Sequence, residues 1–217
     1  MPYSNLTNVV FTVGRMTPDG VNLLGTATLL AKPGHLVTAA HITNKDDQNL
    51  VVVLNSYNSI HDYQDTTKTS VTMVPVKIDA IDPFLDLCIL VADIGEFSNV
   101  TIGSTDNLRV GSKVDIFGYP HSNHGRLVLT QQNTEIGARI LIKSSYVKAK
   151  HIVLNTQTRP GQSGSPIFSA QNQKLVAVLI GSYALGGGGG ISLGGVDPHT
   201  LHQTTHAVSA EYIPELL

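Results

Sequence analysis

Short apolar segments rich in β-branched residues, separated by turn sequences, run through almost the whole chain of 217 residues. Turns such as Thr17-Pro18-Asp19-Gly20 and Lys32-Pro33-Gly34 contain the proline and glycine that typically end strands. No long stretch has the apolar period of an amphipathic helix. The pattern therefore predicts an all-β fold, with strands in the first half of the chain at residues 9–16, 23–31, 35–40, 50–54, 71–78 and 87–94.

A second series of similar segments follows a polar, glycine-punctuated stretch at residues 96–112. Its strands are expected at 113–118, 126–131, 138–143, 151–155, 166–168 and 174–181, before a last strand and a short terminal helix within 207–217. No internal sequence repeat is visible. We expect two six-stranded antiparallel β-barrels packed together, an N-terminal barrel in residues 1–104 and a C-terminal barrel in 105–217.

The composition limits the classes of partner and compartment. With 41% hydrophobic and 14% charged residues, the chain is of globular type, and its net charge of −2 argues against nucleic acid or an anionic membrane as the main partner. A single cysteine permits no internal disulfide. Residues 1–11 lack the features of a signal peptide, and no run approaches transmembrane length, which favours a cytoplasmic protein or a secreted form without its targeting segment.

One serine stands in a setting that suits nucleophilic chemistry. Ser163 lies between two glycines in Gly161-Gln162-Ser163-Gly164, and a proline and an apolar strand follow. Glycines let the backbone approach a substrate and turn successive N–H groups toward one small space. The amides of Gly161 and Ser163 are therefore candidate donors for an oxyanion. A serine hydroxyl also needs a base, and the base needs an orienting partner.

A candidate base and a candidate orienting carboxylate occur earlier in the chain. His41 follows an apolar strand and three small residues, in Thr38-Ala39-Ala40-His41, where other groups can pack close to the imidazole. Asp86 begins the apolar run at 86–90, and a buried carboxylate is costly unless it has a partner such as His41 Nδ1–H. Asp82 is an alternative for this role, whereas Asp46 and Asp47 follow His41 so closely that a turn is favoured.

Other residues with reactive or metal-binding side chains have simpler interpretations. Cys88 lies in an apolar strand without a glycine frame, which favours a small buried hydrophobe over a nucleophile. The spacing of His199, His202 and His206 would suit a metal on a helix, but Pro198 and several threonines favour a loop. The histidines at 121 and 124 are also expected in a solvated loop. No metal or cofactor is therefore predicted.

Four segments, in this order along the chain, resemble the trypsin/chymotrypsin-like serine peptidases, especially their HtrA-like and bacterial glutamyl-endopeptidase-like branches. They are TAAH (38–41), DLCIL (86–90), FGYP (117–120) and GQSGSP (161–166). The resemblance implies a chymotrypsin-like double barrel in which His41 and Asp86 come from the first barrel and Ser163 from the second. It implies a serine endopeptidase that acts on a protein or peptide through an acyl-enzyme. A peptidase-fold protein that binds a peptide without turnover is the alternative, and an esterase with the same triad is a third.

The resemblance also gives expectations about activation and specificity. Trypsin-like enzymes activated by cleavage have an aspartate before the serine, and Gln162 at this position implies no such activation. The implied substrate pocket contains no carboxylate, which disfavours cleavage after Arg or Lys, and Leu179 stands where the glutamyl-specific branch has a histidine. Cleavage after an apolar or small neutral residue is therefore expected. The pocket residues are Gln157, Thr158, Leu179, Ile180, Gly181 and Ser182.

The glycine run at residues 186–190 lacks the Lys-Ser or Lys-Thr of a phosphate-binding loop. It follows a strand that forms one wall of the specificity pocket in the resembled family. We expect residues 185–195 to form a mobile flap beside the substrate groove.

Overall fold

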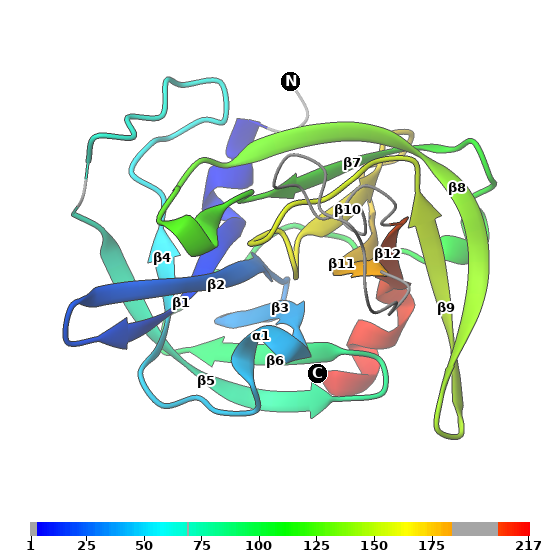
Figure 1. The fold of residues 1–217 in the computed structure, drawn as a ribbon, viewed down its shortest axis with the longest axis horizontal. Helices are drawn as coiled ribbons and strands as arrows, with labels where there is room; N and C mark the ends of the chain where they lie inside the picture. Colours follow the sequence, from blue (N-terminus) through cyan, green and yellow to red (C-terminus); the bar gives the residue numbers. More distant parts are fainter. Residues whose placement is uncertain (1–3, 69, 184–203) are drawn as a thin grey trace, which may run out of the picture.

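The computed structural model describes residues 4–68, 70–183 and 204–217. Its first half forms a closed antiparallel barrel with the strand order β1-β2-β3-β6-β5-β4 (Figure 1). A short 3-10 helix η1 (Ser4–Asn8) precedes the barrel, and one helical turn α1 (Ala40–Thr43) follows its third strand. The strands are β1 (Val10–Thr17), β2 (Gly20–Leu29), β3 (His35–Ala39), β4 (Leu50–Leu54), β5 (Thr72–Asp82) and β6 (Leu87–Ala92).

The second half forms another closed barrel, with the strand order β10-β11-β12-β9-β8-β7. Among its described residues, three 3-10 helices accompany it: η2 (Thr105–Asn107), η3 (Ser122–His124) and η5 (Ala210–Leu216). The strands are β7 (Lys113–Gly118), β8 (Thr130–Ser144), β9 (Val147–Leu154), β10 (Pro166–Ser169), β11 (Leu175–Tyr183) and β12 (Thr204–Ser209).

The predicted fold class is confirmed, but the strands of the second barrel needed correction. The sequence placed two strands at 126–131 and 138–143, whereas β8 is one strand of 15 residues. The register of β8 against β9 shifts between Ile136 and Ala138, so a bulge at Gly137 lets the strand bend without ending. The segment predicted at 151–155 is the end of β9. The sixth strand of this barrel is β12, and the terminal helix is of the 3-10 type.

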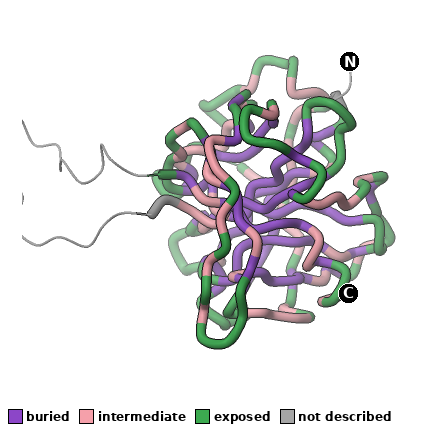
Figure 2. The backbone as a smooth tube through the Cα atoms, turned by 90° about the vertical axis from the view of Figure 1, so that its right-hand side faces the viewer, coloured by how far each residue is buried: buried purple, intermediate pink, exposed green. Residues whose placement is uncertain are grey.

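Each barrel has its own apolar core, and a third buried cluster joins the barrels (Figure 2). The joining cluster contains Val37 and Leu87 of the first barrel and Phe117, Phe168 and Val208 of the second. The rings of Phe117 and Phe168 meet edge to face with their centroids 6.0 Å apart. Because burying each such side chain stabilises the fold by about 1.5–3 kcal/mol, this cluster fixes the seam between the barrels.

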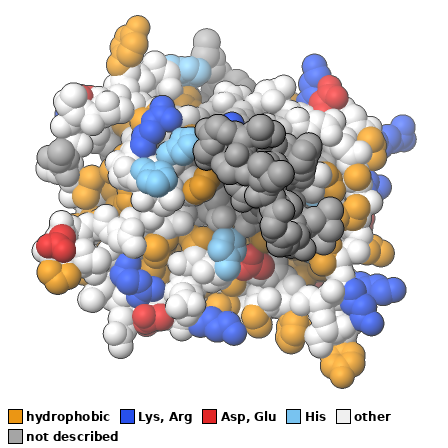
Figure 3. Space-filling view, viewed as in Figure 1, with side chains coloured by type: hydrophobic (Ala, Val, Ile, Leu, Met, Phe, Trp, Pro, Cys, Tyr) orange, Lys and Arg blue, Asp and Glu red, His pale blue; other side chains and the backbone are white. Residues whose placement is uncertain are grey.

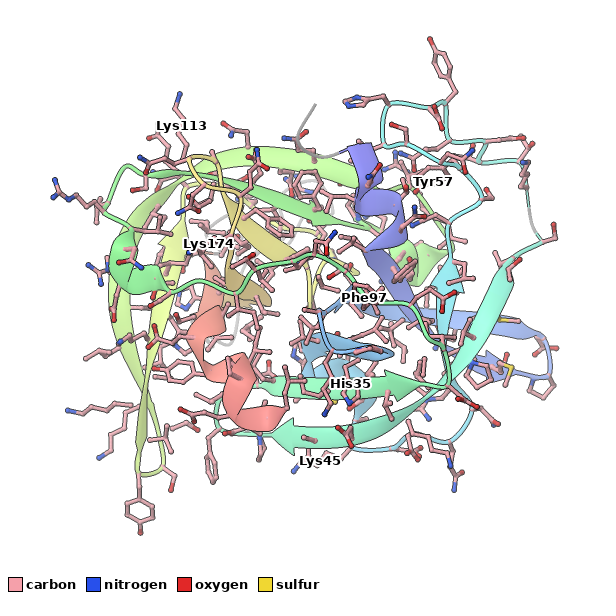
Figure 4. The ribbon with its side chains drawn as sticks, turned by 180° about the vertical axis from the view of Figure 1, so that it is seen from behind. His35, Lys45, Tyr57, Phe97, Lys113 and Lys174 are labelled. Carbon is pink, nitrogen blue, oxygen red and sulfur yellow. The ribbon has the colours of Figure 1, made fainter. Side chains whose placement is uncertain are left out.

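Two further segments also connect the barrels, and both contribute apolar side chains to the joining cluster. The chain between β6 and β7, on which Phe97 is labelled in Figure 4, crosses the back of the molecule. It pairs with β11 through Leu175 N, which donates to Thr101 O at 2.9 Å, and Gly103 N, which donates to Leu175 O at 2.7 Å. The terminal η5 packs against β5, β6 and β11. None of the helices in the described ranges is long and apolar enough to cross a membrane.

Candidate active site

His41 and Asp86 lie next to each other because β3 and β6 are antiparallel neighbours. Ala39 at the end of β3 pairs with Leu87 at the start of β6, so the residues just beyond this pair also meet. Asp86 has φ of 55°, a left-handed conformation that aspartate tolerates better than most residues, and its carbonyl accepts a hydrogen bond from Ala40 N at 3.0 Å. The turn that carries Asp86 is thereby held against the first residue of α1.

The Asp86 carboxylate binds His41 through two hydrogen bonds. Asp86 Oδ1 accepts from His41 N at 2.8 Å, and Asp86 Oδ2 lies 2.6 Å from His41 Nδ1. A carboxylate can only accept, so Nδ1 carries the proton and Nε2 of the neutral ring is free to accept one. The imidazole is about half exposed, with 47% of the side chain accessible, and a substrate can therefore reach it.

The competing carboxylate, Asp82, has a different function in this structure. Its Oδ1 accepts hydrogen bonds from Phe84 N at 2.8 Å and from Leu85 N at 3.0 Å. These bonds close the turn between β5 and β6, and no hydrogen bond or ion pair joins Asp82 to His41 among the described residues. The geometry therefore assigns Asp82 to the turn.

The loop of Ser163 depends on glycines with positive φ. Gly161 has φ of 92° and Gly164 has φ of 84°. A Cβ on Gly164 would lie 2.0 Å from Thr26 O and 2.4 Å from Thr38 Oγ1, so the second barrel approaches β2 and β3 of the first within direct backbone contact. In the described part of the chain, neither the N–H of Gly161 nor that of Ser163 donates a hydrogen bond. Within the described residues, both N–H groups thus lack a protein acceptor.

The same close packing brings the Ser163 loop to the strand that leads to His41. A Cβ on Gly25 would lie 2.8 Å from Ser163 O and 2.9 Å from Ile42 Cδ1, so Ser163 and the neighbour of His41 meet at Gly25. The Ser163 hydroxyl, however, donates to Ile180 O at 3.2 Å. No hydrogen bond joins it to His41 among the residues that the structure describes.

Gln162, between Gly161 and Ser163 in the chain, is buried and is held by uncharged hydrogen-bond partners. Its Oε1 accepts from Arg159 N at 2.7 Å, and its Nε2 donates to Gln132 Oε1 at 2.6 Å. A neutral amide can satisfy both bonds at once. The loop conformation is thus supported at this position by hydrogen bonds of the amide, without an ion pair.

The sequence-derived pocket residues have different environments. Leu179 is fully buried in the core of the second barrel, and Ile180 is partly buried against the other two cores. Gln157 is exposed, and its Oε1 accepts from Arg159 Nη1 at 3.3 Å. Gly181 lies on β11 opposite His206 of β12. The side chain of Ser182, the expected flap at 185–195, and the histidines at 199 and 202 lie outside the described residues.

A partner of the predicted pocket residue Thr158 that sequence reasoning missed is Thr205. Its hydroxyl is fully buried, donates to Thr156 O at 2.6 Å and accepts from Thr158 N at 3.2 Å. The Thr205 and Thr158 hydroxyls are 3.4 Å apart. The pairing of β12 with β9, whose end leads to Thr156 and Thr158, brings these threonines together, so no local signal could have identified Thr205.

The single cysteine has the environment of a structural side chain. Cys88 is fully buried, and burial raises the pKa of its thiol to about 12. The reactive thiolate is therefore scarce at neutral pH. The described ranges contain no group of three or more His, Cys, Asp or Glu side chains that could hold a metal ion.

The two closed barrels, with His41 and Asp86 in one and the glycine-framed Ser163 in the other, define a protein of the chymotrypsin-like fold. Residues 25–178 match the family of the trypsin-like peptidase domain. The chain belongs to this family, as its four motifs predicted.

Two curated relatives match most of the chain. A probable periplasmic serine endoprotease, DegP-like, of Pseudomonas fulva is 25% identical over 154 residues, which cover 69% of this chain and 27% of the relative. The uncharacterized protein y4bJ of Sinorhizobium fredii is 26% identical over 156 residues, which cover 71% of this chain and 21% of the relative. The chain thus spans about a quarter of the length of the curated relatives it matches.

Several solved structures have the same fold. The MamO protease domain of Magnetospirillum magneticum matches with a TM-score of 0.69 at 15% identity, covering 98% of this chain and 97% of that one. The HtrA-type protease AlgW with a decapeptide matches at 0.67 and 17%, covering 98% and 64%. The active form of the Rv3671c protease of M. tuberculosis matches at 0.65 and 17%, covering 98% and 83%.

Proposed function

We propose that this protein is a serine endopeptidase with Ser163 as nucleophile, His41 as base and Asp86 as the residue that orients the base. The observation that carries the proposal is the His41–Asp86 pair, with Nδ1 and Oδ2 2.6 Å apart, at the end of the strand that the Ser163 loop contacts. Membership in the trypsin-like peptidase family supports the same reading. A nucleophile, a base and an orienter for the base are the three parts that acyl transfer requires.

In this proposal Ser163 Oγ attacks the carbonyl carbon of the scissile bond, and His41 Nε2 takes the hydroxyl proton. The carbonyl electrons move to its oxygen, which accepts hydrogen bonds from the N–H groups of Gly161 and Ser163. His41 then gives its proton to the leaving amine as the C–N bond breaks. Water repeats the sequence on the acyl-enzyme, and the acid leaves with Ser163 restored. Asp86 remains ionised and stabilises the imidazolium.

The Ser163 hydroxyl must leave Ile180 O before it can give its proton to His41. The edge of β11 offers a way for substrate to cause this change. Strand β10 pairs with β11 only as far as Val178, and Gly164 N binds Leu179 O, so Ile180 O lies beyond the paired part of this edge. An extended peptide added along this edge would donate a backbone N–H to Ile180 O and displace the serine hydroxyl. Peptide binding is recorded for the HtrA-type protease AlgW, which shares the fold.

For specificity we propose cleavage after an apolar or small neutral side chain. The hydroxyls of Thr158 and Thr205 are engaged with each other and with backbone, and neither brings a charge to the site. Among the described residues of the predicted pocket, none is a carboxylate that would select Arg or Lys. Digestion of a peptide library measures this preference directly, and cuts concentrated after Arg, Lys or Glu would refute it.

Labelling with a fluorophosphonate probe tests the proposed function. We expect the wild type to be labelled, and Ser163→Ala and His41→Ala to remain unlabelled although folded. Labelling at Ser163 that also survives in His41→Ala would contradict the role of the histidine. A folded wild type that is neither labelled nor able to cleave any peptide of a library would favour the alternative, a protein that binds peptides in the groove without turnover.

A further inference from the structure

Thr26 of β2 binds the backbone of both residues whose amides form the proposed oxyanion site. Thr26 Oγ1 donates to Gly161 O at 3.1 Å, and Thr26 N donates to Ser163 O at 2.8 Å. The side chain is fully buried at the seam. A residue of the first barrel therefore holds two carbonyls of the nucleophile loop, which belongs to the second barrel.

The hydrogen bond from Thr26 to Gly161 matters because a glycine has little conformational preference of its own. With φ of 92° and no side chain, Gly161 can turn its N–H toward or away from the site at small energetic cost. On its other side, Pro160 O accepts from His121 N at 2.7 Å. In a trans peptide the carbonyl and the N–H point in opposite directions, so this bond directs the Gly161 N–H away from His121. The Thr26 hydroxyl then fixes the carbonyl side of the same residue.

Thr26 is itself held rigidly. Its carbonyl accepts from Thr38 Oγ1 at 2.6 Å, and its hydroxyl oxygen accepts from Tyr119 N at 3.4 Å. A hydroxyl has one hydrogen to donate, and here Gly161 O receives it. Thr38 lies on β3, three residues before His41. The strand of the base and the loop of the oxyanion donors are thus linked through one buried threonine, in surroundings where hydrogen bonds are strong.

We propose that Thr26 is a positioning residue: its hydroxyl keeps the Gly161 N–H directed at the oxyanion. The inference rests on the proposed function of Ser163. It adds a required residue, Thr26, that lies outside the glycine-framed segment around the serine. Loss of the hydroxyl should weaken stabilisation of the tetrahedral intermediate more than binding of substrate, because the oxyanion exists only after attack.

The test compares Thr26→Val with Thr28→Val. Both threonines are fully buried on β2, but Thr28 Oγ1 has no hydrogen-bond partner among the residues that the structure describes, so Thr28→Val is a matched control for the change of shape and polarity. Thr26→Ser keeps the hydroxyl and serves as the rescue variant. The measurements are the second-order rate of fluorophosphonate labelling, kcat and KM for a peptide that the wild type cleaves, and the melting temperature.

We expect Thr26→Val to slow labelling and lower kcat about tenfold, with KM changed less than about twofold. Thr28→Val and Thr26→Ser should stay within about threefold of the wild type. Equal rates per folded molecule in Thr26→Val and Thr28→Val would overturn the inference. If Thr26→Val does not fold, Thr26→Ala and Thr28→Ala make the same comparison. A wild type that is unlabelled, like Ser163→Ala, would instead refute the proposed function on which the inference rests.

Discussion

His41 and Asp86 are joined within one barrel, by hydrogen bonds between neighbouring strands, whereas Ser163 is held across the seam by residues of the other barrel. The first pair is in bonding geometry, with Nδ1 and Oδ2 2.6 Å apart. The Ser163 hydroxyl is directed at Ile180 O instead. Both regions belong to the same candidate site, yet only one of them is formed by local strand pairing.

The comparison shows which part of the site can change with substrate. The base and its carboxylate are fixed by the register of β3 against β6, so changing them would require unpairing strands. The hydroxyl of Ser163, the proposed nucleophile, is held by one hydrogen bond to Ile180 O, and rotating a serine side chain between staggered conformers costs far less. Figure 3 shows the face on which α1 is labelled in Figure 1, where side chains of both charge signs are interspersed among the described residues.

The largest effect is expected from a substitution that disrupts the His41–Asp86 pair. Asp86→Asn keeps an oxygen for His41 N and fits the left-handed backbone, but it no longer holds the proton on His41 Nδ1. We expect kcat/KM to fall by about 10⁴-fold, with the fold retained. Asp82→Asn is the control, since Asp82 closes the nearby turn, and its activity should stay within about twofold of the wild type. Similar losses in the two variants would contradict the assignment of Asp86.

The second prediction tests how strongly stability depends on the packing of the Ser163 loop against the first barrel. A Cβ on Gly164 would meet Thr26 O at 2.0 Å, at a residue with φ of 84°. Gly20 also has positive φ, but a Cβ there would meet nothing within 4 Å. We expect Gly164→Ala to lower the free energy of unfolding by at least about 3 kcal/mol and Gly20→Ala by about 1 kcal/mol. Equal losses in chemical denaturation would show that the barrels do not press together at Gly164.

The smallest effect concerns His151 of β9, which faces the seam from the second barrel. Burial lowers the pKa of His151 below its usual value of 6.5. As the pH falls through 6.5, the unfolded chain takes up a proton that the folded protein resists, so stability decreases toward acid pH. His151→Asn should reduce this decrease between pH 7.5 and 5.5, as measured by chemical denaturation. At pH 8 the same variant gives the effect of lost packing alone. Parallel curves of unfolding free energy against pH for the wild type and the variant would refute the prediction.

Much of the fold was predictable because strand periodicity and turn residues are local. All six strands of the first barrel were identified, with ends within a few residues of those observed. The error at β8 has a physical cause: the bulge at Gly137 leaves the strand paired with β9, and a glycine in a sequence otherwise signals an end. The pairing of β12 beside β9 and β11 depends on contacts far apart in the chain, which local patterns do not record.

The sequence by itself determined the family, through four motifs that resemble the trypsin-like peptidases, and it predicted the double barrel and the candidate residues His41, Asp86 and Ser163. Only the tertiary structure decided that Ser163 Oγ binds Ile180 O and that Thr26 binds the Ser163 loop. Ser163 and Ile180 are 17 positions apart and meet because the Ser163 loop is hydrogen-bonded to β11, whereas Thr26 and Gly161 are 135 positions apart and meet across the seam. Which atoms meet there depends on how two separately formed barrels pack, and no segment carries that information alone.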